Sequence, residues 1–348
     1  MQIIEYAEAL ASLGAKQKNL LLGNGFSVGC DPIFRYECLY DRAVQQGLSE
    51  RAQAVFERIG TNNFEGVLRL LLDADWVAQE YQLLEPTQGS PIVADIDVIK
   101  KALVDAVAAS HLAHTGLVSA SKKNAALRFL SPYHNVFTTN YDLLLYWVVM
   151  HQPGAPSFLD GFDSDPDEPE APYVTFQHRL GGHRGIYFLH GGLHLYDAHG
   201  ELRKHTWCRT GVPLTDSIRA GLDQGLYPLF VAEGRPEKKL EQIQRSWYLG
   251  HCLSKLSRLE SPLVVFGHAL GESDWHLLSA IARNRKLRRL AVGLYGDPRS
   301  SSNRQICDSV AYAQDRRVEE LNAHRTSKVE GELDVLYFSS ESANVWGQ

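Results

Sequence analysis

Cysteine is scarce in this sequence of 348 residues, and no apolar run approaches the ~20 residues that a membrane span needs. No two of the five cysteines form a Cys-x-x-Cys pair, which argues against a structural zinc site of the usual spacing. Sparse, odd-numbered cysteines are typical of a reducing cytosol. The chain starts without a basic stretch or a long apolar segment, so no export signal is expected. We therefore expect a cytoplasmic protein with no membrane span and no bound metal. The cysteines are Cys30, Cys38, Cys208, Cys252 and Cys307.

Positive charge is not in excess either. The chain has 35 Lys and Arg against 41 Asp and Glu, a formal net charge of −6. Surfaces that bind nucleic acids depend on clustered Lys and Arg to neutralise phosphates. The one basic cluster, at 283–289, ends a predicted helix, where cations are favourable without any ligand. The charge balance therefore argues against direct nucleic-acid binding.

Short apolar runs alternate with helical segments along the chain. Runs of this kind, bounded by glycine or polar residues, predict buried strands. Their alternation with helices predicts an α/β fold with a Rossmann-like parallel sheet. A hydrophobic content of 44% is enough for a full core, and we expect one α/β domain over residues 1–348. The predicted strands are 19–22, 134–138, 185–190, 263–266, 290–295 and 333–338.

Two segments interrupt the alternation. The region 38–130 is predicted to contain helices at 38–60, 62–84 and 92–130. This region is longer than a minimal crossover between two strands, so we expect it to be a helical insertion packed over the ligand crevice. His111 and His114 lie in it without nearby carboxylates or cysteines, and we expect them to be solvated or capping residues. Residues 152–172 are acidic and contain several prolines and glycines, which predicts a surface loop.

Glycine or polar side chains follow several of the predicted strands directly. The first strand runs into Gly23-Asn-Gly-Phe-Ser27, the second into Thr138-Thr-Asn-Tyr-Asp142, and the third into His190-Gly191. A later strand ends in the segment Gly267–Asp274. In open α/β sheets the ligand lies beyond the carboxyl ends of the strands, so these segments predict one shared crevice. Each segment alone also fits a simpler structure, such as a tight turn or an Asx turn that caps the next helix.

The residue types suit cleavage of an N-glycosidic bond. Glycines let a backbone approach a pyrophosphate closely, because they have no Cβ. The amide of Asn140 can hold a water molecule in one orientation, and Asp142 can accept hydrogen bonds from a ribose hydroxyl or a carboxamide. A histidine such as His190 can take a proton from a hydroxyl or from water. A positively charged leaving group such as nicotinamide needs little acid assistance.

Taken together, these motifs resemble the sirtuin fold, and in particular the sirtuin-like domains of prokaryotic anti-phage defence proteins. Gly23-Asn-Gly-Phe-Ser27 is similar to the sirtuin turn that holds the NAD pyrophosphate, and Thr138–Asp142 is similar to the Thr-Gln-Asn-x-Asp motif. His190-Gly191 resembles the catalytic His-Gly, and Phe34-Arg35 resembles the Phe-Arg that closes over nicotinamide, one residue early. The strand ending at Gly267 matches the one whose loop contacts ribose. The motifs occur in the family order over residues 20–275, and the pattern also resembles a bacterial sirtuin-like domain family of unassigned function.

Three departures from the sirtuin pattern affect what the resemblance implies. Thr139 replaces a glutamine that contacts the ribose, and His268-Ala269 replaces the usual Thr-Ser. The two Cys-x-x-Cys pairs that bind zinc beside the peptide groove of deacylases are missing. Without that module an acyl-lysine peptide has no evident docking surface. The resemblance therefore points to NAD hydrolysis rather than to protein deacylation.

The resemblance implies an NAD glycohydrolase that uses NAD as its substrate and needs no metal. His190 would accept the proton, Asn140 would orient water, and Asp142 would lie at the nicotinamide end. Two alternatives stay open: a sensor that binds NAD or ADP-ribose without turnover, and an ADP-ribosyltransferase or deacylase. The residues expected to bind NAD are Gly23, Asn24, Gly25, Phe26, Ser27, Phe34, Arg35, Thr138, Thr139, Gly191, Gly267, His268, Ser273 and Asp274.

Uncontrolled NAD hydrolysis would kill the cell that contains it, so we expect the activity to be gated. The resemblance to abortive-infection proteins suggests gating by homo-oligomerisation or by a defence partner. Such a partner would be a HerA-type ATPase or an Argonaute-like sensor. The sequence itself names no trigger.

Overall fold

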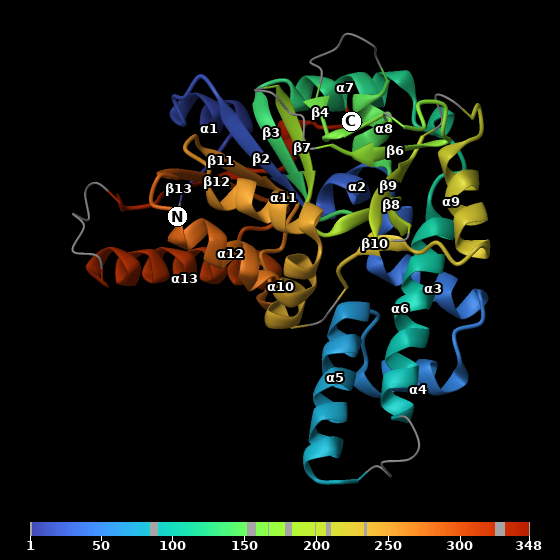
Figure 1. Ribbon diagram of the computed structural model, residues 1–348. Helices are drawn as coiled ribbons and strands as arrows, with labels where there is room; N and C mark the ends of the chain where they lie inside the picture. The colour runs from blue at the N-terminus through green and yellow to red at the C-terminus, as the bar shows by residue number, and fades with distance from the viewer. Residues whose placement is uncertain are drawn as a thin grey trace.

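An eight-stranded sheet forms the centre of the computed structural model (Figure 1). The structure describes residues 2–83, 90–151, 158–165, 167–177, 183–198, 200–206, 210–232, 235–323 and 331–347. Every pair of neighbouring strands in this sheet is parallel. The strands are β1 (Ile3–Ile4), β2 (Lys18–Leu22), β3 (Tyr133–Thr138), β4 (Phe158–Leu159), β7 (Arg184–Phe188), β11 (Leu263–Phe266), β12 (Arg289–Leu294) and β13 (Asp334–Ser339).

The strand order identifies the architecture. The six strands with four or more residues lie in the order β7-β3-β2-β11-β12-β13. Numbered along the chain, this is the order 3-2-1-4-5-6 of the doubly wound dinucleotide-binding fold. The order reverses between β2 and β11, which are hydrogen-bonded neighbours. The predicted α/β class with a Rossmann-like parallel sheet is therefore confirmed.

A second, five-stranded antiparallel sheet was not predicted as a sheet, although the sequence predicted strands at 173–180 and 193–196, where two of its strands lie. Its strands β5 (Phe162–Asp163), β6 (Tyr173–Phe176), β8 (Gly191–Ala198), β9 (Glu201–His205) and β10 (Pro228–Phe230) lie in the order β10-β8-β9-β6-β5. Strand β9 is rich in charge, but Lys204 is buried because it pairs with Asp160 at 2.5 Å. An ion pair between residues that are far apart in the chain produces no local sequence pattern from which a buried strand could be predicted. Strand β8 begins immediately after His190, so this sheet adjoins the predicted site.

Part of the segment 152–172, which was predicted to be a surface loop, forms strands instead. Strands β4 and β5 lie within it, and Tyr173 begins β6 directly after it. Residues 152–157 and 166 of that loop lie outside the described residues. The prediction of a continuous loop is therefore wrong for the described part.

The region 38–130 is helical, as predicted, but its helices are shorter. The predicted helix 38–60 is two helices, because Gly47 has a φ of +93° and Ser49 caps the second helix by accepting from the Ala52 amide. In Figure 1, α4, α5 and part of α6 extend away from the sheet. The helices are α3 (Tyr36–Gln45), α4 (Glu50–Ile59), α5 (Phe64–Glu80), α6 (Pro91–Ser110) and α7 (Ala120–Leu130).

The remaining helices accompany the two sheets. No helix in the described ranges has the length and apolar composition to cross a membrane. The helices are α1 (Tyr6–Ser12), α2 (Gly25–Cys30), α8 (Leu144–Val149), α9 (Leu214–Asp223), α10 (Pro236–Arg245), α11 (Trp247–Ser257), α12 (Trp275–Arg283) and α13 (Ser301–Ala323).

A fully buried arginine on α13 holds the carboxyl end of α12. The guanidinium of Arg317 donates to the backbone carbonyls of Ile281, Ala282, Leu287 and Gly331. The last carbonyls of a helix have no partner within the helix, so these bonds satisfy two of them. The bonds to Ile281 and Ala282 therefore fix α12, which carries a histidine of the site described below.

Candidate functional site

A cavity of about 490 Å³ lies at the carboxyl ends of the central strands. This volume is within the range of small-molecule and cofactor sites. Residues after β2, β3, β7 and β11 form its polar wall, and apolar residues from the helical region, including Phe64, Leu103 and Val107, form the opposite wall. The predicted site residues that line the cavity are Gly23, Asn24, Phe34, Thr139, Asn140, Asp142, His190, Gly267, His268, Ser273 and Asp274.

The turns after β2 and β11 touch each other, and glycines make this possible. A Cβ on Gly23 would lie 2.5 Å from the Cα of His268, and one on Gly25 would lie 2.6 Å from the Cα of Gly267. The amide of Gly25 donates to the carbonyl of Gly267 at 2.8 Å. Contact between two backbones thus requires both glycines, independently of any ligand. Asn24 links this turn to the segment that carries Phe34, since its Nδ2 donates to the carbonyl of Phe34 at 3.1 Å.

Asn140 is held in one orientation by a buried network. Its Nδ2 donates to the carbonyl of Gly23 at 3.1 Å and to Oγ of Ser27 at 3.0 Å. Ser27 in turn donates to Oδ2 of Asp142 at 2.5 Å, and the other oxygen of Asp142 accepts from the Leu144 amide at 2.9 Å. Burial raises the pKa of Asp142, and the bonds from Ser27 and Leu144 oppose this rise. Both hydrogens of Nδ2 are used, so the Asn140 amide is oriented before any ligand arrives.

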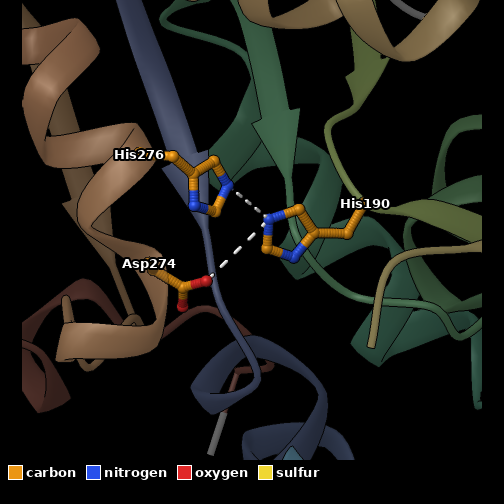
Figure 2. Close-up of side chains that lie close together, drawn as sticks. All are labelled: His190, Asp274 and His276. Atoms are coloured by element: carbon orange, nitrogen blue, oxygen red, sulfur yellow. Dashed lines mark hydrogen bonds and ion pairs between the residues drawn. The ribbon is translucent and has the colours of Figure 1, made fainter. Parts of the chain in front are cut away.

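His190 belongs to a cluster of buried ionisable groups (Figure 2). Its Nε2 lies 3.0 Å from Nε2 of His276 and 3.9 Å from Oδ1 of Asp274. The same Oδ1 accepts from Nζ of the fully buried Lys239 at 2.9 Å, and Oδ2 lies 3.7 Å from Nε2 of His268. Lys239 comes from α10, Asp274 ends the 3₁₀ helix η3 (Glu272–Asp274), and His276 lies in the first turn of α12.

Burial decides the protonation states in this cluster. Desolvation lowers the pKa of His190 well below its usual value, although the charge of Asp274 opposes the shift. Desolvation likewise lowers the pKa of His276 to about 4 and lowers the pKa of His268. Burial, the largest influence, would raise the pKa of Asp274, but the Lys239 ammonium and the neighbouring histidines together outweigh it and hold this pKa well below the usual range. At neutral pH the cluster therefore holds three neutral imidazoles and one carboxylate–ammonium pair.

His111 is buried rather than solvated, but it is the C-cap residue of α6, which agrees with the other half of the expectation. It follows the last residue of α6, and its Nε2 accepts from the Leu143 amide at 2.8 Å while Nδ1 lies 3.1 Å from the Leu112 carbonyl. The ring contacts Phe34 and Trp147 edge to face. His111 thus connects the helical region to the loop that carries Asn140 and Asp142.

This arrangement predicts a pH dependence of stability. Desolvation lowers the pKa of His111 from 6.5 to about 4, so between these values the unfolded chain binds a proton that the folded protein does not. The stability contributed by the neutral ring is fully present above pH 6.5 and should fall by up to about 3 kcal/mol as the pH drops towards 4. Between pH 7 and pH 5, the free energy of unfolding measured with urea should fall more for the wild type than for His111→Gln. Equal losses in the two proteins would contradict this assignment.

Six predicted site residues do not line the cavity. Phe26 is buried against Trp346, with ring centroids 4.8 Å apart, and Ser27 is fully buried beneath Asn140 and Asp142. Arg35 is exposed, and Thr138 is buried and accepts from the Asn140 amide at 3.0 Å. The remaining two, Gly25 and Gly191, allow backbones to approach each other. The buried residues among them support the site from behind, whereas the exposed Arg35 has no contact with it.

Sequence reasoning missed His276 and Lys239, which complete the cluster around His190 and Asp274. It also missed three polar residues that line the cavity, Asn63, Arg69 and Gln305. His276 had a usable signal, because it follows Asp274 by two residues at the start of a helix. Lys239 had none, since it lies in a run of charged residues, 237–241, that is typical of an exposed helix face. Its burial depends on how α10 packs against α12 and η3.

The chain belongs to the protein family described as "Domain of unknown function (DUF4917)", whose model matches residues 20–346. No curated protein matches it significantly. Among solved structures it is similar to one titled as a Sir2 mutant with a p53 peptide and NAD. The identity is 15%, the match covers 93% of this chain and 100% of that one, and the TM-score is 0.33. Similarity at this level carries no argument about function, and the fold assignment rests on the strand order described above.

Proposed function

We propose that the protein is an NAD glycohydrolase, which cleaves the bond between nicotinamide and ribose to release nicotinamide and ADP-ribose. The observation that carries this proposal is the placement of His190 and the oriented Asn140 amide in one cavity at the point where the strand order reverses. Nucleotides bind at this point in doubly wound sheets. The similarity of the motifs to those of sirtuins supports the same substrate.

The cluster around His190 suits proton acceptance. A neutral imidazole can take a proton from a ribose hydroxyl or from water, and Asp274 lies 3.9 Å from its Nε2 to stabilise the resulting cation. Lys239 moderates this attraction, because it already neutralises much of the Asp274 charge at 2.9 Å. His190 would therefore gain a proton only when the reaction generates one.

The Asn140 network suits the positioning of water. Because Nδ2 is committed to Gly23 and Ser27, Oδ1 remains as the acceptor that can hold a water molecule against the ribose. Asp142 is itself committed to Ser27 and Leu144, so its main role would be to fix Ser27 and Asn140. Its position in the cavity wall also suits a contact at the nicotinamide end.

Control of the activity forms part of the proposal. An NAD glycohydrolase without control would deplete its own cell, so assembly into a homo-oligomer or a defence partner would switch it on. A HerA-type ATPase or an Argonaute-like sensor is the kind of partner that the resemblance to abortive-infection defence proteins suggests. The alternative is a non-catalytic NAD or ADP-ribose sensor, which the substitutions at Thr139 and His268 favour.

The test is to measure nicotinamide and ADP-ribose released from NAD by the full-length protein over a range of protein concentrations, alone and with candidate partners. Release in equal amounts would support hydrolysis, and a steep concentration dependence would support gating by assembly. Thermal stabilisation by NAD without release would favour the sensor. Transfer of ADP-ribose or loss of an acyl group from a protein, seen by mass spectrometry, would favour a transferase or deacylase.

Asn140→Ala should lower NAD cleavage by about a hundredfold, the usual cost of losing one oriented polar group in an active site. The matched control is Asn135→Ala in β3, the strand that precedes Asn140, since the Nδ2 of Asn135 donates to Oδ1 of Asn19 at 2.8 Å, away from the cavity. Steady-state nicotinamide release should be close to wild type in the control. A similar loss in both variants would indicate damage to the strand rather than to the site.

A further inference from the structure

We propose that His190, Asp274 and His276 form a site for a divalent transition metal such as Zn²⁺, and that metal occupation inhibits the protein by removing His190 from the reaction. The binding half of this proposal stands without the proposed function, and the inhibitory half rests on it. The sequence predicted no metal because it contains no cysteine pair, and His190 lies far along the chain from Asp274 and His276.

The geometry of the three side chains fits a metal ion. Figure 2 shows His190 facing His276 and Asp274 across a small gap. The two Nε2 atoms are 3.0 Å apart, close to the about 3.3 Å that separates two nitrogens bound tetrahedrally to zinc at about 2.0–2.1 Å. One ligand atom of each residue lies within 4.8 Å of the others. Small side-chain rotations would place all three around one ion.

The donor set indicates the class of metal. Two imidazoles and one carboxylate match zinc and similar transition metals, whereas Ca²⁺ and Mg²⁺ prefer oxygen ligands alone. His190 and His276 are both nine-tenths or more buried, and Nδ1 of His276 has no partner among the described residues. His190 and Asp274 also line the cavity, which leaves the fourth position of a tetrahedral ion open to water or ligand.

Metal binding and proton acceptance compete for the same histidine. A metal on Nε2 of His190 takes the lone pair of that nitrogen and leaves the proton on Nδ1, so the ring has no acceptor left. The ion also places positive charge beside His190, which opposes protonation. An occupied site should therefore be inactive in NAD cleavage.

Lys239 weakens the site in a way that can be tested. Its ammonium lies 2.9 Å from Oδ1 of Asp274, so an incoming dication must displace this contact or use Oδ2. Repulsion between the two cations lowers metal affinity relative to a closed zinc site. Removing the charge should raise the affinity, the opposite of the effect of removing a ligand.

The experiment titrates Co²⁺ and Zn²⁺ into the full-length protein, using the visible absorption of Co²⁺ to report coordination and calorimetry to report the affinity for Zn²⁺. The wild type should bind one equivalent. His276→Gln, which keeps a polar side chain beside His190 but is a poor metal ligand, should bind at least tenfold more weakly. Lys239→Met should bind at least tenfold more tightly, and His134→Ala, at the far end of β3, should match the wild type.

Equal Co²⁺ spectra and affinities in the wild type and His276→Gln would overturn the proposal, because binding would then lie elsewhere. If Lys239→Met does not fold, Lys239→Gln makes the same comparison with a shorter polar side chain. Circular dichroism of each variant checks the fold before titration. Absence of metal binding in the folded wild type would also overturn it.

Inhibition by the metal is tested by measuring the rate of NAD cleavage in the presence of Zn²⁺ and again after a chelator is added. Wild-type cleavage should fall at least tenfold with Zn²⁺ and recover with the chelator, and any cleavage left in His276→Gln should be insensitive to Zn²⁺. Metal binding without NAD cleavage in any condition would count against the proposed function and leave the site standing. Cleavage that is unaffected at saturating Zn²⁺ would overturn the inhibitory half.

Discussion

Replacing His190 by alanine is expected to lower NAD cleavage by about a thousandfold, the middle of the range for general acid–base catalysis. The side chain is 2% exposed, and its ring makes polar contacts with His276 and Asp274. Its loss removes the proton acceptor and leaves the oriented Asn140 amide in place. Cleavage should therefore fall while NAD binding persists.

The measurement is single-turnover nicotinamide release by the wild type and His190→Ala, with NAD affinity determined in parallel by thermal shift. His134→Ala is the matched control, because this histidine lies at the opposite end of the same sheet. The control should retain wild-type cleavage. If His190→Ala cleaves NAD at the wild-type rate, His190 is not the proton acceptor and the proposed mechanism is wrong.

The central sheet could be predicted because its inner strands are largely buried. Leu20–Leu22 and Leu263–Phe266 are short runs of apolar residues, and each residue in them is at most 7% exposed. Such runs need no partner to be recognised, since burial on both faces removes any alternation. The order of these strands, 3-2-1-4-5-6, comes from the structure and is that of the doubly wound fold.

Strands at 173–180 and 193–196 could be predicted, but their pairing in a separate antiparallel sheet with the charged strand β9 could not, because distant partners bury the polar residues of β9. The burial of Lys204 depends on Asp160, and Arg203 stacks on the ring of Tyr173 at 3.9 Å. Both partners lie tens of residues away in the sequence. A strand whose polar residues are buried by distant partners has the composition of an exposed segment.

The same distinction applies to the site. Asn140, Asp142 and His190 follow strands directly, so the sheet alone brings them together, as the sequence predicted. His276 reaches His190, and Lys239 reaches Asp274, only through the packing of α12 and α10. Sequence patterns predict which residues lie at the strand ends, but not which helices supply the charged and polar groups beside them.

Gly191→Ala is expected to destabilise the fold by several kcal/mol, a large part of the roughly 5–15 kcal/mol that stabilises a typical domain. Gly191 has a φ of +82°, and a Cβ there would lie 1.9 Å from the carbonyl oxygen of Leu229. The neighbouring backbone cannot give way easily, because Phe230 pairs with Gly191 and the Val231 amide donates to the carbonyl of His190 at 3.0 Å.

Gly200→Ala is the matched control for this prediction, because Gly200 has a φ of +86° and a Cβ added there would meet no described atom within 4 Å. It should lose only about 1–2 kcal/mol, the cost of a left-handed backbone conformation. Urea unfolding of both variants separates this conformational cost from the collision with Leu229. Equal losses would show that the collision relaxes, whereas the expected larger loss at Gly191 gives the glycine after His190 a structural origin: it lets β10 cross directly beside the histidine and hold its backbone.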